Sequence, residues 1–120
     1  VVCAPGGRVG EVGKADLLEA GQTERASAYA MTAESYGFEL LYLEAGSGAT
    51  TPVSEELIRA ARNSCNLTLV VGGGIRDGET ARKAVQAGAD WIITGNLTES
   101  FDDADELQKV LTEFISTMNS

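Results

Sequence analysis

The chain has 120 residues and a mass of 12.5 kDa, which is the size of a single domain. Apolar residues make up 43% and charged residues 22% of it, a balance that excludes the disordered and fibrous classes. No apolar run approaches the ~20 residues that a membrane-spanning helix requires. Eighteen acidic against nine basic residues give a net charge of −9, which disfavours nucleic acid and anionic membrane surfaces as partners.

The chain contains no histidine, and this excludes several kinds of chemistry. Without an imidazole there is no Ser-His or Cys-His nucleophile pair and no histidine-bound zinc. Proton transfer therefore falls to a carboxylate, a lysine, a tyrosine or a water molecule. Cys3 and Cys65 lack the CxxC spacing of a metal or redox site, so we expect buried, reduced thiols in a cytoplasmic protein.

Short apolar runs of strand character alternate with stretches of helical character, in the order βαβαβαβα. The third run, Leu67–Val71, is almost continuously apolar, which is typical of a parallel strand that is covered on both faces. The sequence therefore predicts an α/β fold with parallel strands. The four predicted strands are Val1–Ala4, Glu39–Leu43, Leu67–Val71 and Trp91–Thr94.

The predicted helices have capping residues at their starts and glycines near their ends. The candidate N-caps are Thr23, Ser54, Asp77 and Asp103. The last helix carries an apolar stripe at helical spacing, which predicts a core-facing surface. The stripe consists of Leu107, Val110, Leu111, Phe114, Ile115 and Met118. The long glycine-rich stretch Gly6–Gln22 follows the first strand, and we predict that it is a functional loop.

Two glycine motifs fail as nucleotide-binding signatures. Arg8–Ala15 resembles a Walker A loop, but Arg8 replaces its first glycine and Ala15 replaces the Ser or Thr that binds magnesium. Gly72–Asp77 follows a strand and opens a helix, but Asp77 occupies the third glycine position of a dinucleotide fingerprint. The replacements at Arg8 and Ala15 exclude a Walker A loop. A carboxylate at Asp77 would repel a pyrophosphate, which excludes a dinucleotide-binding turn.

Glycine-rich turns follow two consecutive predicted strands, at Gly72–Gly74 and at Gly95–Asn96. Paired turns of this kind are typical of the phosphate site of a (β/α)₈ barrel, where backbone N–H groups hold the anion. Backbone amides can bind phosphate even in a protein with a large negative charge. The alternative is that these glycines only form tight turns between strands and helices.

The segment Tyr42–Gly48 contains the best candidate for acid–base chemistry. Alternation along the strand places Tyr42 and Glu44 on one face and Leu43 on the other. A glutamate that faces inward is costly unless it is paired or used, so Glu44 is a candidate base or hydroxyl-binding group. The turn Gly46–Gly48 adds a serine hydroxyl and free amides. The alternative is a structural tyrosine beside a solvent-facing glutamate.

Taken in order, the segments at 42–48, 71–76, 87–90 and 94–96 resemble the geranylgeranylglyceryl phosphate synthase family. These are archaeal TIM-barrel prenyltransferases, and heptaprenylglyceryl phosphate synthases are their bacterial relatives. The resemblance covers nearly the whole chain, and YLEAGSG at 42–48 is its most specific part. It implies that residues 1–120 form a single domain, the C-terminal (βα)₄ half of a (β/α)₈ barrel. Such a barrel needs about 250 residues, so we expect a fragment of a longer polypeptide or a half-barrel completed by another copy.

The resemblance also implies an activity and its site. The enzyme would join a prenyl (geranylgeranyl) diphosphate to sn-glycerol 1-phosphate through an ether bond in membrane lipid synthesis, and this part alone would be inactive. Glu44 would orient or deprotonate the glycerol hydroxyl. Mg²⁺, bound by residues outside this chain, would neutralise the diphosphate. The implied substrate-binding residues are Tyr42, Leu43, Glu44, Ala45, Gly46, Ser47, Gly48, Gly73, Gly74, Gly95 and Asn96.

Two other functions stay open at this point. The glycine turns alone suit another phosphate-binding TIM-barrel enzyme, an isomerase or a synthase. A preference for a sugar phosphate over glycerol phosphate would favour that alternative. A half-barrel can also be a non-catalytic assembly module, which an obligate dimer without ligand binding would indicate.

Overall fold

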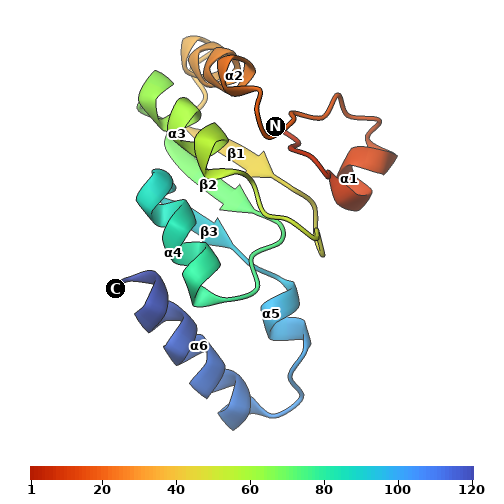
Figure 1. The fold of residues 1–120 in the computed structure, drawn as a ribbon, viewed down its shortest axis with the longest axis vertical. Coiled ribbons are helices and arrows are strands. Elements are labelled where there is room, and N and C mark those ends of the chain that lie inside the picture. The colour runs from red at the N-terminus through yellow and green to blue at the C-terminus, as the bar shows by residue number, and fades with distance from the viewer.

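A computed structural model describes all 120 residues and shows a parallel three-stranded sheet with helices packed along it (Figure 1). The strand order is β1-β2-β3. Helix α2 packs against α3, α3 against α4, and α4 against α6. The elements are α1 (Gly7–Val12), α2 (Thr23–Ser35), β1 (Leu40–Glu44), α3 (Glu55–Ser64), β2 (Thr68–Gly72), α4 (Gly78–Ala87), β3 (Trp91–Ile93), α5 (Asn96–Glu99) and α6 (Ala104–Met118).

The two faces of the sheet have different environments. Leu43, Leu69 and Val71 point toward the helices and are fully buried in the core. On the opposite face Trp91 is 62% exposed and Leu40 is 53% exposed. The predicted parallel α/β fold is confirmed, but the sheet is covered by helices on only one of its faces.

The first predicted strand, Val1–Ala4, is confirmed only as two isolated parallel bridges: Val2 pairs with Glu44, and Cys3 pairs with Leu18. The N–H of Cys3 donates to the carbonyl of Glu44 at 2.8 Å, and the N–H of Glu44 donates to the carbonyl of Val1 at 3.0 Å, as in a parallel pair. Pro5 follows directly and has no N–H to continue a ladder, and Gly6 then adopts a left-handed φ of 81°. The pairing therefore stops after two residues, although it still places this segment beside β1.

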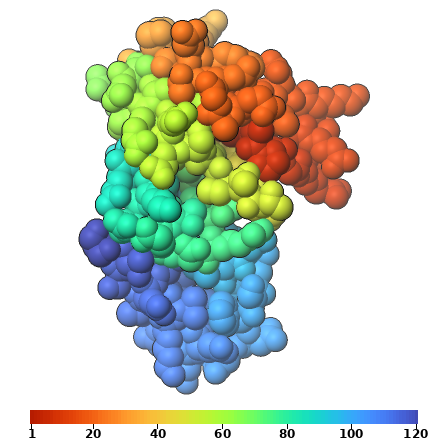
Figure 2. Space-filling model, in the orientation of Figure 1, coloured from red at the N-terminus to blue at the C-terminus, as the bar shows by residue number.

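The stretch Gly6–Gln22 is not wholly irregular as predicted, because it contains the short helix α1. The N–H of Gly10 donates to the carbonyl of Gly6 at 2.9 Å and closes the first helical turn. Gly10 is buried, and a Cβ there would lie only 3.0 Å from Leu17 Cδ2. The missing side chain thus lets the helix pack closely on the following segment. Figure 2 shows this N-terminal part projecting from the body of the molecule.

Three of the four predicted N-caps are confirmed by side-chain hydrogen bonds. Ser54 Oγ accepts from the N–H of Leu57, and Asp77 Oδ1 accepts from the N–H of Thr80. Asp103 also caps its helix, but Thr23 is the first residue of α2 rather than its cap. These caps fix where α3 and α4 begin, and therefore the length of the loops that precede them.

The predicted core stripe of α6 is only partly buried. Phe114 is buried, whereas Ile115 is 51% exposed and the other four side chains are partly covered. The reason is that α6 packs mainly on α4. At that contact Gly78 is essential, since a Cβ there would lie 2.8 Å from the carbonyl oxygen of Phe114.

Both cysteines are buried and unpaired, as predicted. Burial raises the pKa of the Cys3 thiol to about 11, so this thiol stays protonated at neutral pH. None of the helices combines the length and the apolar character needed to cross a membrane.

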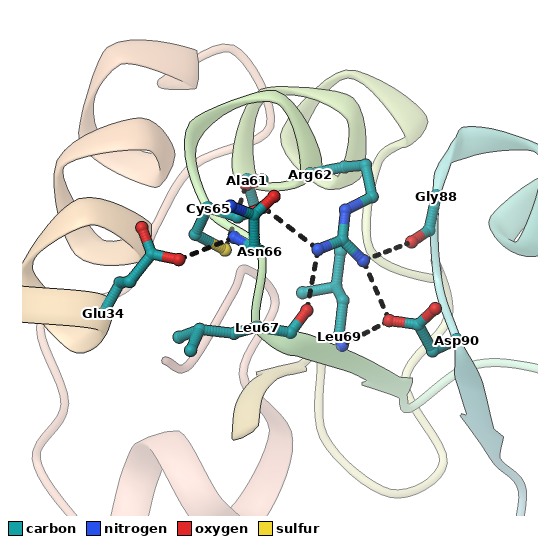
Figure 3. A network of polar contacts seen from close by, with 9 residues as sticks. All are labelled: Glu34, Ala61, Arg62, Cys65, Asn66, Leu67, Leu69, Gly88 and Asp90. Atoms are coloured by element: carbon teal, nitrogen blue, oxygen red, sulfur yellow. Dashed lines mark hydrogen bonds and ion pairs between the residues drawn. The ribbon is translucent and has the colours of Figure 1, made fainter. Parts of the chain in front are cut away.

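Arg62 connects several backbone segments at the amino ends of the strands (Figure 3). Its guanidinium donates to the carbonyls of Cys65 at 3.0 Å and Leu67 at 2.7 Å, and to Asp90 Oδ2 at 2.8 Å. The same carboxylate oxygen accepts the N–H of Leu69 at 2.8 Å. One side chain thus joins the end of α3 to the starts of β2 and β3.

Replacing Arg62 by methionine should lower the free energy of unfolding by about 2 kcal/mol, because it removes charge-assisted hydrogen bonds to three segments. Urea denaturation measures this loss. Arg59→Met is the matched control: it is on the same helix, but its ion pair with Glu55 is exposed, so we expect a change below about 0.5 kcal/mol. Equal effects of the two substitutions would contradict the assigned role of Arg62.

Candidate functional site

A cleft of about 100 Å³ lies at the carboxyl ends of the three strands. Parallel strands end at the same edge of a sheet, so the loops after β1, β2 and β3 meet there. The lining residues are Tyr42, Glu44, Ser47, Gly48, Gly73, Gly74, Ile75, Arg76, Ile93, Thr94, Gly95 and Asn96.

The carboxylate of Glu44 is held in place by two donors. The N–H of Gly46 donates to Oε1 at 2.6 Å, and the hydroxyl of Tyr42 donates to Oε2. Burial, together with the hydrogen bond to Glu44 and the charge of Glu44, raises the pKa of Tyr42. The phenol therefore stays protonated and remains a donor. A carboxylate has about four acceptor sites, so Glu44 keeps acceptor capacity for a ligand.

The predicted orientation of these side chains is confirmed. Tyr42 and Glu44 line the cleft together, while Leu43 is fully buried on the opposite face. The alternative of a solvent-facing glutamate does not hold, because Glu44 is half-buried and bonded to two neighbours.

Gly72 provides the space for this pair of side chains. The register of the sheet places it directly across from Glu44. A Cβ at Gly72 would lie 2.5 Å from Tyr42 Oη and 3.1 Å from Glu44 Oε2. Any side chain at this position would push the tyrosine and the glutamate out of the cleft.

The positions of Gly73 and Gly74 require glycine for two reasons, the lack of space for a side chain and an unusual backbone conformation. Their φ angles are 86° and 73°, in the left-handed region that favours glycine. A Cβ at Gly73 would lie 2.7 Å from Glu44 Oε1 and 2.7 Å from the nitrogen of Gly46. The loop after β2 therefore lies directly against the carboxylate and the turn after β1.

Several backbone amides at the cleft donate to no acceptor within the protein. They include those of Gly73 and Gly74 after β2, and those of Gly95 and Asn96 after β3. Asn96 is the first residue of α5, where an N–H has no partner within the helix. Unpaired amides gathered at one cleft are suited to binding an anion.

Eight of the substrate-binding residues predicted from the sequence line this cleft: Tyr42, Glu44, Ser47, Gly48, Gly73, Gly74, Gly95 and Asn96. The other three do not. Leu43 and Ala45 are fully buried, because the alternation of the strand turns them toward the helices. Gly46 lies behind the cleft and contributes its amide to Glu44.

Four further residues of the cleft, Ile75, Arg76, Ile93 and Thr94, were not predicted from the sequence. Thr94 Oγ1 donates to the carbonyl of Ile75 at 2.8 Å and so joins the loops after β2 and β3. Arg76 follows the GGGI run directly, and that position is the only signal in the sequence of its proximity to the cleft.

The cleft residues do not fit a magnesium site. Glu44 is the only carboxylate that lines the cleft, and both of its oxygens accept hydrogen bonds from the protein. No group of three or more Cys, Asp or Glu side chains in the chain is arranged to hold a metal ion.

The parallel βα units and the cleft at their carboxyl ends define a half-barrel of the (β/α)₈ class. The solved structure of (S)-3-O-geranylgeranylglyceryl phosphate synthase from Thermoplasma acidophilum, in complex with substrate sn-glycerol-1-phosphate, superposes with a TM-score of 0.89 at 38% identity. The superposition covers 98% of this chain and 46% of that one. The chain belongs to the PcrB family, whose model matches residues 1–116.

Curated relatives carry the same name as this neighbour. The geranylgeranylglyceryl phosphate synthase of Thermoplasma volcanium is 44% identical over 120 residues, which are 100% of this chain and 46% of the relative. That of Methanothrix thermoacetophila is 50% identical over 104 residues, 86% of this chain and 41% of the relative. The chain thus spans about half the length of the curated relatives it matches.

Substituting Gly73 by alanine should lower the free energy of unfolding by about 2 kcal/mol, because the new Cβ clashes with Glu44 and Gly46 in a strained conformation. Urea denaturation again provides the measurement. Gly21→Ala is the matched control, since a Cβ there meets nothing within 4 Å, and we expect a change within about 0.5 kcal/mol. An unchanged stability of Gly73→Ala would show that the loop does not require glycine.

Proposed function

We propose that this chain supplies the glycerol-phosphate site of a prenyltransferase that joins geranylgeranyl diphosphate to sn-glycerol 1-phosphate. One observation carries the proposal: the fixed carboxylate of Glu44 and a group of unpaired backbone amides line the same cleft. A ligand with a hydroxyl at one end and a phosphate at the other matches that arrangement. The names of the relatives, and the sn-glycerol-1-phosphate held by the Thermoplasma acidophilum synthase, support it.

The phosphate would be held by the amides of Gly73, Gly74, Gly95 and Asn96. Neutral N–H groups bind an anion without adding cations, so the site does not conflict with the net charge of −9. They are also fixed by the backbone, so binding the ligand costs little ordering of side chains. The hydroxyl of Ser47, which lies on the lining of the cleft, is a further donor.

Glu44 would then act on the glycerol hydroxyl. The hydroxyl oxygen forms a bond to C1 of the prenyl chain while the bond from C1 to the diphosphate oxygen breaks, and the diphosphate leaves with the electron pair. Glu44 accepts the hydroxyl proton. Tyr42 and the N–H of Gly46 hold the carboxylate at the position from which it reaches that proton.

The remaining parts of the reaction would lie outside residues 1–120. Mg²⁺ would neutralise the leaving diphosphate, and the described residues form no site for it. The exposed sheet face with Leu40 and Trp91 would be the inner face of the barrel, covered by further βα units of a longer polypeptide or by another copy. We also infer a cytoplasmic, archaeal enzyme, since the relatives are archaeal synthases.

Glu44→Gln should lower kcat/KM by about 100-fold or more, because it keeps the shape of the side chain and removes the base. The assay uses the polypeptide at its natural length with geranylgeranyl diphosphate, sn-glycerol 1-phosphate and Mg²⁺. Glu39→Gln, at an exposed residue just before β1, is the control and should leave the rate unchanged.

Two results would contradict the proposal. A fully active Glu44→Gln variant would exclude Glu44 as the base. If the unaltered polypeptide forms no prenylated product, the proposed reaction itself is wrong. A preference for a sugar phosphate would then favour another phosphate-binding barrel enzyme, and the absence of any ligand binding would favour an assembly module.

A further inference from the structure

The turn after β1 is attached to the rest of the molecule by very few hydrogen bonds. Within it, the N–H of Ala49 donates to the carbonyl of Gly46 at 3.1 Å. Gly46 and Gly48 have φ angles of 99° and 71°, and glycines at such positions gain the most freedom when they are released. A turn that carries Ser47 into the cleft therefore needs an attachment beyond its own backbone.

Arg76 provides that attachment. Its Nη2 donates to the carbonyl of Gly48 at 3.1 Å and to the carbonyl of Ala49 at 3.1 Å. The residues joined are 28 and 27 positions apart in the sequence, so the contact connects the loop after β2 to the turn after β1. No other hydrogen bond joins residues 47–53 to another loop.

Resting on the proposed function, we propose that Arg76 is a positioning residue that clamps the turn Gly46–Ala49 over the cleft and thereby sets the affinity for the glycerol-phosphate substrate. The clamp holds Ser47 and Gly48 in the lining of the cleft. A Cβ at Gly48 would lie 3.4 Å from Asn96 Nδ2, so the turn reaches the residues that follow that strand. Loss of the clamp would let the turn move away from Asn96 and open the cleft.

The chemistry of the guanidinium suits this role better than that of an ammonium group. Arg76 is exposed, so its charge is screened by solvent and contributes little to the strength of binding. Its planar group presents several fixed N–H donors, and two carbonyls share one of its nitrogens here. A lysine would keep the charge, but its flexible stem would not hold both carbonyls in one geometry.

The first test measures the clamp without relying on any activity. Hydrogen–deuterium exchange of the unliganded polypeptide at its natural length is followed for the amide of Ala49, which is buried and donates to the carbonyl of Gly46 within the turn. Arg76→Met should speed its exchange at least about fivefold, and Arg76→Lys should do so nearly as much. Arg82→Met is the control, since its ion pair with Glu79 lies on the surface of α4 and away from the cleft. Unchanged exchange in Arg76→Met would overturn the proposal.

The second test measures the consequence for the substrate. With saturating geranylgeranyl diphosphate and varied sn-glycerol 1-phosphate, Arg76→Met and Arg76→Lys should each raise KM about tenfold and change kcat less than about twofold. A lysine variant with the original KM would overturn the clamp in favour of a simple charge effect. A loss confined to kcat would also overturn it. If the unaltered polypeptide makes no product while exchange responds as expected, the proposed function fails and the clamp stands.

Discussion

The parallel pairing of β1 with β2 is the constraint on which the site depends. Its register sets Glu44 across from Gly72, so a carboxylate meets a stretch of backbone without side chains. The space left by Gly72 accommodates the tyrosine that donates to the carboxylate, and Gly73 lies against the other carboxylate oxygen. If the register moved by one residue, Leu43 would enter the cleft and Glu44 would enter the core.

The proposed function sets the cleft two electrostatic tasks that oppose each other. A carboxylate must stay ionised to accept a proton, and it repels any phosphate that binds nearby. The fold reduces this conflict by surrounding Glu44 with two donors and by presenting unpaired amides at the other loops. Donors attached to the backbone cannot turn away from the ligand. The unpaired amides and the carboxylate of Glu44 therefore keep their separate places in the cleft.

The sequence predicted most of what is local. The three strands of the sheet start and end within a residue of their predicted bounds, because their apolar runs are almost continuous. Alternation correctly placed Tyr42 and Glu44 on one face, and the caps at Ser54 and Asp77 were readable because a cap bonds within its own turn. The family was also recognisable, chiefly from the residues at 42–48.

What the sequence did not predict depends on distant partners. The burial of the stripe on α6 is set by how much of it α4 covers, and periodicity does not report that. The failure of Val1–Ala4 to form a full strand depends on the course of the chain after Pro5. Arg76 acts on carbonyls that are 27 and 28 residues away, so no local pattern connects them.

The fold must hold its strands together and must also form the cleft, and Arg62 contributes to the first of these at the end of the sheet away from the cleft. Its contacts fix the amino ends of the strands, whereas the cleft lies at their carboxyl ends, about the length of a strand away. Substitutions in the loops around the cleft leave that network untouched. Evolution can therefore change the ligand of such a half-barrel by altering one set of loops, while the opposite end continues to hold the scaffold together.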